Sequence, residues 1–253
     1  MADPVSILDH PIISSRYFYP QAATFADPYW VEAADGSRLA CSYRAVQPDA
    51  KTVVYFHGNG EVVTNYLPSF ANWFNGMGYN LLLAEYRGYG MSTGTPALAG
   101  MLDDVEPLLD SLQIPAEKTI VFGRSIGSLY AVHGVARRPQ LGGLILESGV
   151  ADLGQRFFQR VLPEELDVSE AELLAELHKH FDAKKKLGSF QGKTLVLHAR
   201  HDELIGAEHA EMLHAAVQEP KQLKIFEQGG HNDIFYRNQV EYVKLVEDFL
   251  ATV

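Results

Sequence analysis

Short apolar runs alternate with helical patterns along most of the chain, and this alternation restricts the fold more than any other feature of the sequence. The runs are rich in β-branched, aromatic and leucine residues and stop at glycine or polar turns, which is typical of buried strands. Near-continuous apolar strands occur in parallel sheets with both faces covered. The alternation therefore predicts a doubly wound α/β sheet. The expected strands are residues 51–57, 79–84, 118–122, 142–146 and 193–197.

Two helices are expected between these strands. Apolar residues recur three and four positions apart over residues 62–77 and 98–112, which indicates a buried helix face. Pro68 and Pro107 interrupt the two patterns, so each helix is expected to bend or restart there.

The sheet is expected to begin with an antiparallel hairpin. Residues 23–32 and 38–44 flank the dipeptide Asp35-Gly36. An Asp-Gly pair between two strand-like runs is a strong signal for a tight hairpin turn.

A single domain over residues 1–253 is the simplest interpretation of the length, since one α/β domain can occupy roughly 200–250 residues. Residues 149–188 break the alternation with about forty residues of amphipathic and charged sequence. We interpret this segment as a helical insertion into the domain.

Composition and charge exclude several classes of function. The chain has 21 Lys and Arg against 32 Asp and Glu, a formal charge of -11, so nucleic acid and anionic membrane surfaces are not expected partners. No window approaches the ~18 apolar residues of a spanning helix, and the N-terminus lacks the pattern of a signal peptide. Cys41 is the single cysteine, which rules out an internal disulfide and a cysteine-based zinc site. We expect a soluble, cytoplasmic protein without a membrane span.

A candidate nucleophile lies in the pentapeptide 123–127, which matches the pattern G-x-S-x-G. The pattern alone is weak, but here it follows the expected strand 119–122 and precedes a helix-forming stretch, 126–136. In that context the serine occupies a sharp, strained strand-to-helix turn with glycines on either side for clearance. Ser125 is therefore the predicted nucleophile; the alternative is a small residue in a tight turn.

A serine hydroxyl needs a base that accepts its proton. His231 lies in the glycine-rich loop 228–232, between the strand-like run 222–226 and the last helical pattern, at the edge where strand ends converge. His57, His198 and His201 also follow strands and remain alternatives. His57 fits better as a structural donor under the neighbouring loop.

The base in turn needs a carboxylate that fixes its tautomer. Asp202 follows the strand 194–197 and gives the chain order Ser125, Asp202, His231. This order is expected of α/β-hydrolases and differs from the orders in the two large serine protease folds. Glu203, beside it, and Glu147, at the end of the preceding strand, are the competing carboxylates.

Two backbone amides are candidates for stabilising the developing oxyanion. The N–H of Ile126 follows the nucleophile at the start of a helix, where the dipole favours negative charge. The second is expected in the loop 57–60, and Asn59 is the favoured donor. The alternative is that this loop is glycine-rich only because its turn requires it.

Four motifs resemble those of the α/β-hydrolase superfamily, and more narrowly its small abhydrolase-domain or serine aminopeptidase-like serine hydrolases. They are residues 55–60, 85–92, 123–127 and 230–233, and the likeness spans about residues 25–250. The resemblance implies an α/β-hydrolase fold, with an eight-stranded, mostly parallel sheet and helices on both faces. It also implies the triad and the two oxyanion donors named above. Relatives often have Asp where Glu85 stands, a departure that concerns loop packing.

The sequence thus predicts a serine hydrolase without metal or cofactor. It would cleave small-molecule carboxylic esters or thioesters through an acyl-enzyme on Ser125. The insertion 149–188 would form a lid, because it lies between strands whose ends face the site. Its apolar side chains would line the acyl pocket, or would simply attach the insertion to the domain. They are Phe157, Phe158, Val161 and Leu162.

Two other functions compete with this prediction. An aminopeptidase would need a carboxylate near the site to hold the substrate's ammonium group, and Glu164, Glu165 or Asp167 could supply it, although such charge runs usually form solvated surfaces. A non-catalytic ligand-binding protein could also use this fold. That reuse often sacrifices a triad member, whereas all three positions here carry competent side chains.

Overall fold

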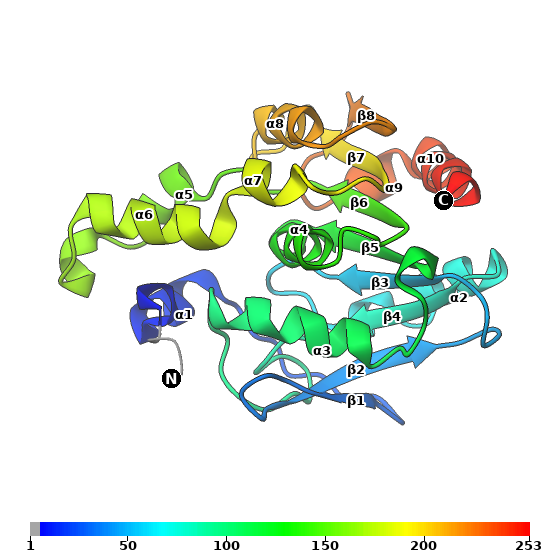
Figure 1. Ribbon diagram of the computed structural model, residues 1–253, viewed down its shortest axis with the longest axis horizontal. Helices are drawn as coiled ribbons and strands as arrows, with labels where there is room; N and C mark the ends of the chain where they lie inside the picture. Colours follow the sequence, from blue (N-terminus) through cyan, green and yellow to red (C-terminus); the bar gives the residue numbers. More distant parts are fainter. Residues whose placement is uncertain (1–5) are drawn as a thin grey trace.

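Eight strands form one sheet in the computed structural model, which describes residues 6–253. Their order is β1-β2-β4-β3-β5-β6-β7-β8 (Figure 1). β2 pairs antiparallel with β1 and β4, and the other pairings are parallel, which confirms the predicted mostly parallel sheet. The strands are β1 (Tyr29–Glu32), β2 (Arg38–Arg44), β3 (Thr52–Phe56), β4 (Asn80–Ala84), β5 (Thr119–Arg124), β6 (Gly143–Glu147), β7 (Lys193–Ala199) and β8 (Lys221–Phe226).

Helices cover both faces of this sheet. In β3, Val54 and Phe56 belong to one hydrophobic cluster, whereas Val53 and Tyr55 belong to the other. The first cluster includes residues of α3, α4 and α8, and the second includes residues of α2 and α10. The helices are α1 (Pro11–Tyr17), α2 (Ser69–Gly76), α3 (Val105–Asp110), α4 (Gly127–Arg137), α5 (Gly154–Phe158), α6 (Glu170–Phe181), α7 (Ala183–Leu187), α8 (Glu208–Ala216), α9 (Ile234–Arg237) and α10 (Gln239–Thr252).

The two prolines act differently on the expected helices. Pro68 separates a short 3₁₀ helix, Val63–Tyr66, from α2, so the predicted restart occurs there. Pro107 lies inside the first turn of α3, where a proline is tolerated because an N–H at that position has no partner within the helix. The break in the second pattern instead falls between a 3₁₀ helix at Gly100–Asp104 and α3.

The hairpin at the start of the sheet is shorter than its sequence pattern. β1 begins at Tyr29, which faces Cys41 of β2 across the ladder. Pro28 directly precedes β1, and a proline cannot donate a hydrogen bond to a strand ladder. Gly36 in the turn has a φ of +84°, as the Asp-Gly signal implies.

Residues 149–188 contain α5, α6 and α7 and a 3₁₀ helix at Pro163–Leu166. In Figure 1 this segment extends beyond one end of the sheet and lies beside α1. Hydrogen bonds attach it there, among them Arg16 to Glu165 at 2.6 Å and the Ser6 hydroxyl to Glu176 at 2.9 Å. No helix among residues 6–253 has the length and apolar character needed to cross a membrane.

Gly127 permits the closest approach between a helix and the sheet. A Cβ atom built on Gly127 would lie 2.1 Å from the carbonyl oxygen of Phe56, which is backbone and cannot rotate away. We predict that Gly127→Ala lowers the free energy of unfolding by about 1–3 kcal/mol or more, since overpacking a close contact displaces backbone. Denaturant unfolding measures the change.

Gly76→Ala is the matched control, because its added Cβ meets no atom within 4 Å. Alanine has the higher helix propensity, so this variant should be as stable as the wild type or slightly more stable. Equal stability of Gly127→Ala and the wild type would contradict the proposed steric role.

Candidate active site

The turn between β5 and α4 holds Ser125 in a left-handed backbone conformation, with a φ of 53°. Such a conformation is costly for a residue other than glycine and persists when the surroundings enforce it. Here the Ser125 N–H donates to the Glu147 carbonyl at 2.9 Å, and Gly123 lies so close to α4 that a Cβ would be 2.6 Å from its backbone. The strand-to-helix turn predicted for the pentapeptide 123–127 is therefore present.

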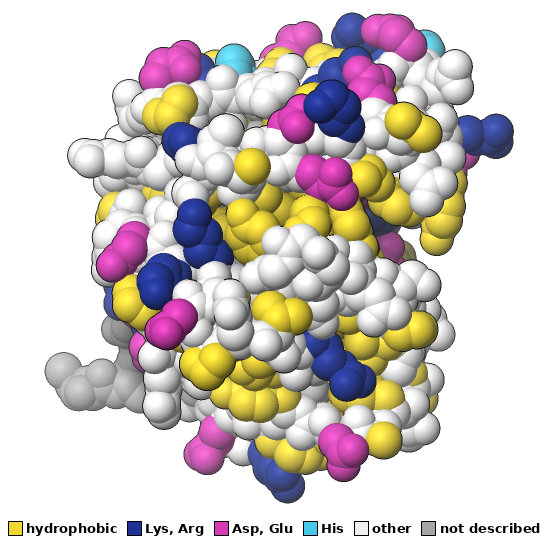
Figure 2. Space-filling view, turned by 90° about the vertical axis from the view of Figure 1, so that its right-hand side faces the viewer, with side chains coloured by type: hydrophobic (Ala, Val, Ile, Leu, Met, Phe, Trp, Pro, Cys, Tyr) yellow, Lys and Arg dark blue, Asp and Glu magenta, His cyan; other side chains and the backbone are white. Residues whose placement is uncertain are grey.

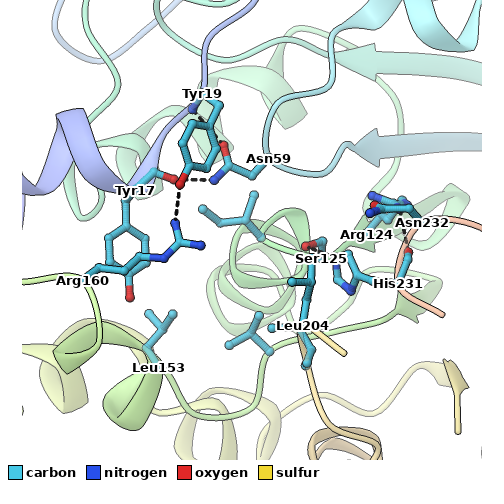
Figure 3. Close-up of a pocket in the computed structure, with 13 residues that line it drawn as sticks. Tyr17, Tyr19, Asn59, Arg124, Ser125, Leu153, Arg160, Leu204, His231 and Asn232 are labelled. Atoms are coloured by element: carbon cyan, nitrogen blue, oxygen red, sulfur yellow. Dashed lines mark hydrogen bonds between the residues drawn. The ribbon is translucent and has the colours of Figure 1, made fainter. Parts of the chain in front are cut away.

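Ser125, His231 and Asp202 form a continuous hydrogen-bonded chain. His231 Nε2 lies 2.8 Å from Ser125 Oγ, and its Nδ1 lies 2.8 Å from Asp202 Oδ2 (Figure 3 shows Ser125 and His231). A carboxylate can only accept, so Nδ1 carries a proton and Nε2 is free to accept the serine proton. All three residues are buried, which shields the hydrogen bonds between them from competing water.

The backbone after Asp202 keeps its carboxylate charged. The N–H groups of Leu204 and Ile205 donate to Asp202 Oδ1 at 2.9 and 2.7 Å. Burial acts to raise the pKa of Asp202, but the hydrogen bond and charge of His231, together with these two amides, outweigh burial and hold that pKa below its usual value. A charged Asp202 can therefore stabilise the protonated form of His231.

The competing histidines and carboxylates occupy other positions. His198 Nε2 donates to the Ile205 carbonyl at 2.8 Å, beneath the Asp202 loop, and His201 is exposed. Glu203 is also exposed. None of these three residues contacts Ser125 or His231 in the described part of the chain.

Arg124 connects the loop 228–232, which carries His231 and is called the histidine loop below, with the loop after β3. Its Nη2 donates to the His231 carbonyl at 2.8 Å, and its Nε donates to Glu147 Oε1 at 3.1 Å. Its Nη1 binds Glu61, whose other oxygen accepts from the Gly58 N–H at 2.6 Å. Burial opposes the charge on Arg124, but attraction to Glu147 and Glu61 raises its pKa. Glu147 thus supports the site through Arg124 and does not touch the histidine ring.

His57 and Glu85 form a buried pair below the same loop. His57 Nε2 lies 2.7 Å from Glu85 Oε1, and its Nδ1 donates to the Gly58 carbonyl at 2.8 Å. Burial acts to lower the pKa of His57, but the hydrogen bond and charge of Glu85 outweigh it and raise that pKa. Glu85 therefore contacts the start of the predicted oxyanion loop and does more than pack its own loop.

Asn59 and Ile126 both line the cavity beside Ser125. In the described residues, neither backbone N–H donates to another protein atom. The Asn59 side chain is engaged elsewhere: its Oδ1 accepts from the Tyr89 hydroxyl at 2.8 Å and from the Tyr19 N–H at 3.1 Å. The two residues predicted to supply the oxyanion amides thus line the cavity, and their N–H groups have no hydrogen-bond acceptor among the described residues.

The cavity above Ser125 has a volume of about 210 Å³ (Figure 3). Its apolar wall comes from Val150, Leu153, Leu204 and Ile205. A larger cavity of about 760 Å³ lies on the other side of Arg124 and does not include Ser125. The smaller cavity is therefore the one in which a substrate could meet the serine.

The four residues predicted to line an acyl pocket are not among the residues that line this cavity. Phe157 and Val161 are fully buried in the core, and the Phe157 ring packs 5.1 Å from that of Tyr17. Phe158 packs against the same core, and Leu162 is 54% exposed. The Phe157 ring thus attaches the insertion to the N-terminal segment, in line with the alternative that the sequence left open.

Several cavity residues escaped the sequence analysis, among them the apolar wall and three side chains that carry polar groups. Tyr17 and Tyr19 come from the N-terminal segment, and Arg160 follows α5 in the insertion. The sequence places Tyr17 and Tyr19 two positions apart, but this spacing is as compatible with a surface loop as with a cavity wall. Their placement depends on the contacts between the N-terminal segment and the insertion, which no local pattern encodes.

The sheet order, the strained turn and the hydrogen-bonded trio together define an α/β hydrolase. Among residues 6–253, no group of three or more His, Cys, Asp or Glu side chains could hold a metal ion. A family model described as serine aminopeptidase, S33, matches residues 47–187, more than half of the chain. The chain therefore belongs to this hydrolase family.

Known proteins resemble the chain over most of its length. It is 26% identical over 255 residues to the uncharacterized protein YfhR of Escherichia coli, covering 93% of this chain and 86% of that protein. It is 26% identical over 232 residues to alpha/beta hydrolase domain-containing protein 17B of Homo sapiens, covering 88% and 74%.

Solved structures show the same fold. The esterase Pf2001 of Pyrococcus furiosus matches with a TM-score of 0.72 at 17% identity, covering 92% of this chain and 97% of that one. A monoacylglycerol lipase of Paleococcus ferrophilus matches with a TM-score of 0.67 at 17% identity, covering 85% and 98%. At these identities the likeness establishes the fold alone.

Asp202→Asn tests the carboxylate assignment. An amide at this position favours the wrong tautomer of His231 and cannot stabilise its protonated form, so we predict a loss of about 10³- to 10⁴-fold in the reactivity of Ser125. The measurement is the rate of labelling by a fluorophosphonate probe. Glu203→Gln, which changes the exposed neighbouring carboxylate, should label at the wild-type rate. If Glu203→Gln labels slowly and Asp202→Asn labels at the wild-type rate, Glu203 and not Asp202 is the carboxylate that supports His231.

The raised pKa of His57 predicts that the stability of the fold depends on pH. Its pKa in the folded state is raised above the unfolded value of ~6.5, so its stabilising contribution is fully present below that pH and is lost as pH rises through the folded-state pKa. The stability advantage of the wild type over His57→Gln should therefore shrink as pH rises. Denaturant unfolding over a pH series measures it, and an advantage that grows with pH would contradict the assignment.

Proposed function

We propose that this protein is a serine hydrolase that cleaves carboxylic ester or thioester bonds through an acyl-enzyme intermediate. The observation that carries the proposal is the pair of 2.8 Å contacts that join Ser125 to His231 and His231 to Asp202. This arrangement can convert a weak hydroxyl nucleophile into a reactive one. The esterase and lipase neighbours are consistent with it.

In the first half of the proposed reaction, Ser125 Oγ attacks the scissile carbonyl while His231 Nε2 accepts its proton. The same nitrogen then protonates the departing alcohol or thiol, and the acyl group remains on Ser125. In the second half a water molecule takes the place of the alcohol, and His231 accepts the proton from water and returns it to Ser125. Asp202 stays charged throughout and stabilises the protonated ring.

The oxyanion formed at each step would be stabilised by the amides of Asn59 and Ile126. Both line the cavity beside Ser125, and Ile126 is the residue before the first turn of α4. Removing one such donor typically costs ~2.7–4 kcal/mol of transition-state stabilisation. The loop that carries Asn59 is supported from below by the pair His57–Glu85 and by Glu61 on the Gly58 N–H.

The cavity disfavours the aminopeptidase alternative. Glu165 is bound to Arg16 at 2.6 Å on the surface, and neither Glu164 nor Asp167 lines the cavity. Among the described residues the cavity lining contains no Asp or Glu and contains the arginines Arg124 and Arg160. Such a wall does not attract the ammonium group of a peptide N-terminus.

The insertion is the proposed lid of a single domain spanning residues 1–253. Leu153 and Arg160 from this segment line the cavity opposite Ser125, which supports the assignment (Figure 3). We also retain a cytoplasmic location as part of the proposal. Its support is that Cys41 is the single cysteine and is buried in β2, so the fold does not depend on an internal disulfide.

Ser125→Ala tests the proposed function. The variant should lose turnover of nitrophenyl esters and labelling by a fluorophosphonate probe while its circular dichroism remains unchanged, because the hydroxyl that carries the acyl group is gone. For the wild type, short acyl chains should be preferred over long ones, since about 210 Å³ lies below the roughly 300–1,000 Å³ typical of ligand pockets.

Ser15→Ala, an exposed substitution in α1, is the control and should retain full activity. A wild type that neither turns over esters nor reacts with the probe would support the non-catalytic ligand-binding alternative. Turnover that survives in Ser125→Ala would remove the serine from the mechanism.

A further inference from the structure

Arg160 places a positive charge in the cavity wall with no carboxylate beside it. Its Nη1 donates to the Tyr19 hydroxyl at 2.9 Å and to the Arg16 carbonyl at 3.2 Å. The guanidinium lies over the rings of Tyr17 and Tyr19, 5.3 and 5.7 Å from their centroids. Within residues 6–253, with the undescribed side chains of Gln155 and Arg156 set aside, no Asp or Glu forms an ion pair with it.

The other arginine of the cavity differs in this respect. The charge of Arg124 is balanced by Glu147 and Glu61, and its Nη2 group donates to the histidine loop. The exposed Arg16, next to Arg160 in space, is paired with Glu165. Half-buried Arg160 therefore keeps Nε and Nη2 without an acceptor among the described residues, and the described lining of the cavity contains no acidic side chain.

Figure 3 shows Arg160 and Ser125 on opposite sides of the cavity, with the guanidinium directed into the space between them. A molecule that fills about 210 Å³ and presents its carbonyl to Ser125 would place its far end beside Arg160. Guanidinium groups bind carboxylates through two parallel hydrogen bonds, which are among the stronger contacts available in a partly desolvated site.

We infer that the substrate is an anionic ester or thioester, with a carboxylate on the acyl or alcohol part that Arg160 holds across the cavity from Ser125. This inference rests on the proposed function and names its substrate class. The chain as a whole carries a charge of -11 and repels anions at long range. Selection of an anionic substrate must therefore come from a local cation, and Arg160 is placed to supply it.

A purely structural role for Arg160 makes a different prediction. Its bonds to the Arg16 carbonyl and the Tyr19 hydroxyl connect the insertion to the N-terminal segment. If that connection were its function, a substitution would slow the hydrolysis of neutral and anionic esters by the same factor. A specificity residue changes the ratio between them.

The experiment compares kcat/KM for two matched substrate pairs. One pair differs on the acyl side, para-nitrophenyl hydrogen adipate against para-nitrophenyl hexanoate. The other differs on the alcohol side, meta-carboxyphenyl butyrate against its methyl ester. The wild type should prefer the anionic member of at least one pair by about tenfold or more, and the preference should decline as salt screens the charge.

Arg160→Gln should abolish that preference while retaining hydrolysis of the neutral ester, and Arg160→Lys should keep part of it, because the charge remains without the bidentate geometry. Arg137→Gln removes the same charge from α4 at the exposed pair with Glu106 and should leave the ratio unchanged. The inference is overturned if the wild type prefers neither anionic ester, or if the preference survives in Arg160→Gln.

Failure of this inference is distinguishable from failure of the proposed function. Ser125-dependent hydrolysis of the neutral esters without any anionic preference would remove the role of Arg160 and leave the serine hydrolase intact. Absence of both neutral-ester turnover and fluorophosphonate labelling in the wild type would remove the proposed function itself.

Discussion

The close approach of α4 to the end of β3 is the constraint on which the active-site edge depends. Where Gly127 meets the Phe56 carbonyl there is no room for a side chain, so the start of the helix is fixed against the strand by backbone alone. Ser125 lies two residues before that contact, and the loop that carries Asn59 begins directly after Phe56. One backbone contact thus sets the position of the predicted nucleophile relative to both candidate oxyanion amides.

Buried charges also hold other loops in place at this edge of the sheet. Arg124 bonds to the histidine loop, and His57 with Glu85 supports the loop after β3. Buried ion pairs add little net stability, because desolvation of the charges offsets their attraction. Displacing one of these loops, however, would leave an unpaired charge in the interior. The charges therefore restrict where the loops of the candidate site can lie more than they stabilise the fold.

The parts of the site that could be predicted are those encoded beside a strand end. Ser125, Asp202 and His231 each follow a recognisable strand-like run, and the convergence of parallel strand ends brings such positions together. The cavity wall could not be predicted in this way. Whether Phe157 faces the cavity or the core depends on how α5 packs against α1, and amphipathic periodicity identifies a buried face without identifying its partner.

The difference between the residues at the strand ends and those of the cavity wall explains why membership of a fold family does not determine the substrate. The sheet edge carries the candidate reacting groups, and the fold around it is shared with the esterase Pf2001, to which this chain is 17% identical or less. The wall opposite Ser125 comes from the N-terminal segment and the insertion, and there the chain presents a guanidinium where recognition of an ammonium group would need a carboxylate. Because charge complementarity discriminates between partners through repulsion as well as attraction, this wall constrains the substrate more tightly than membership of a serine aminopeptidase family does.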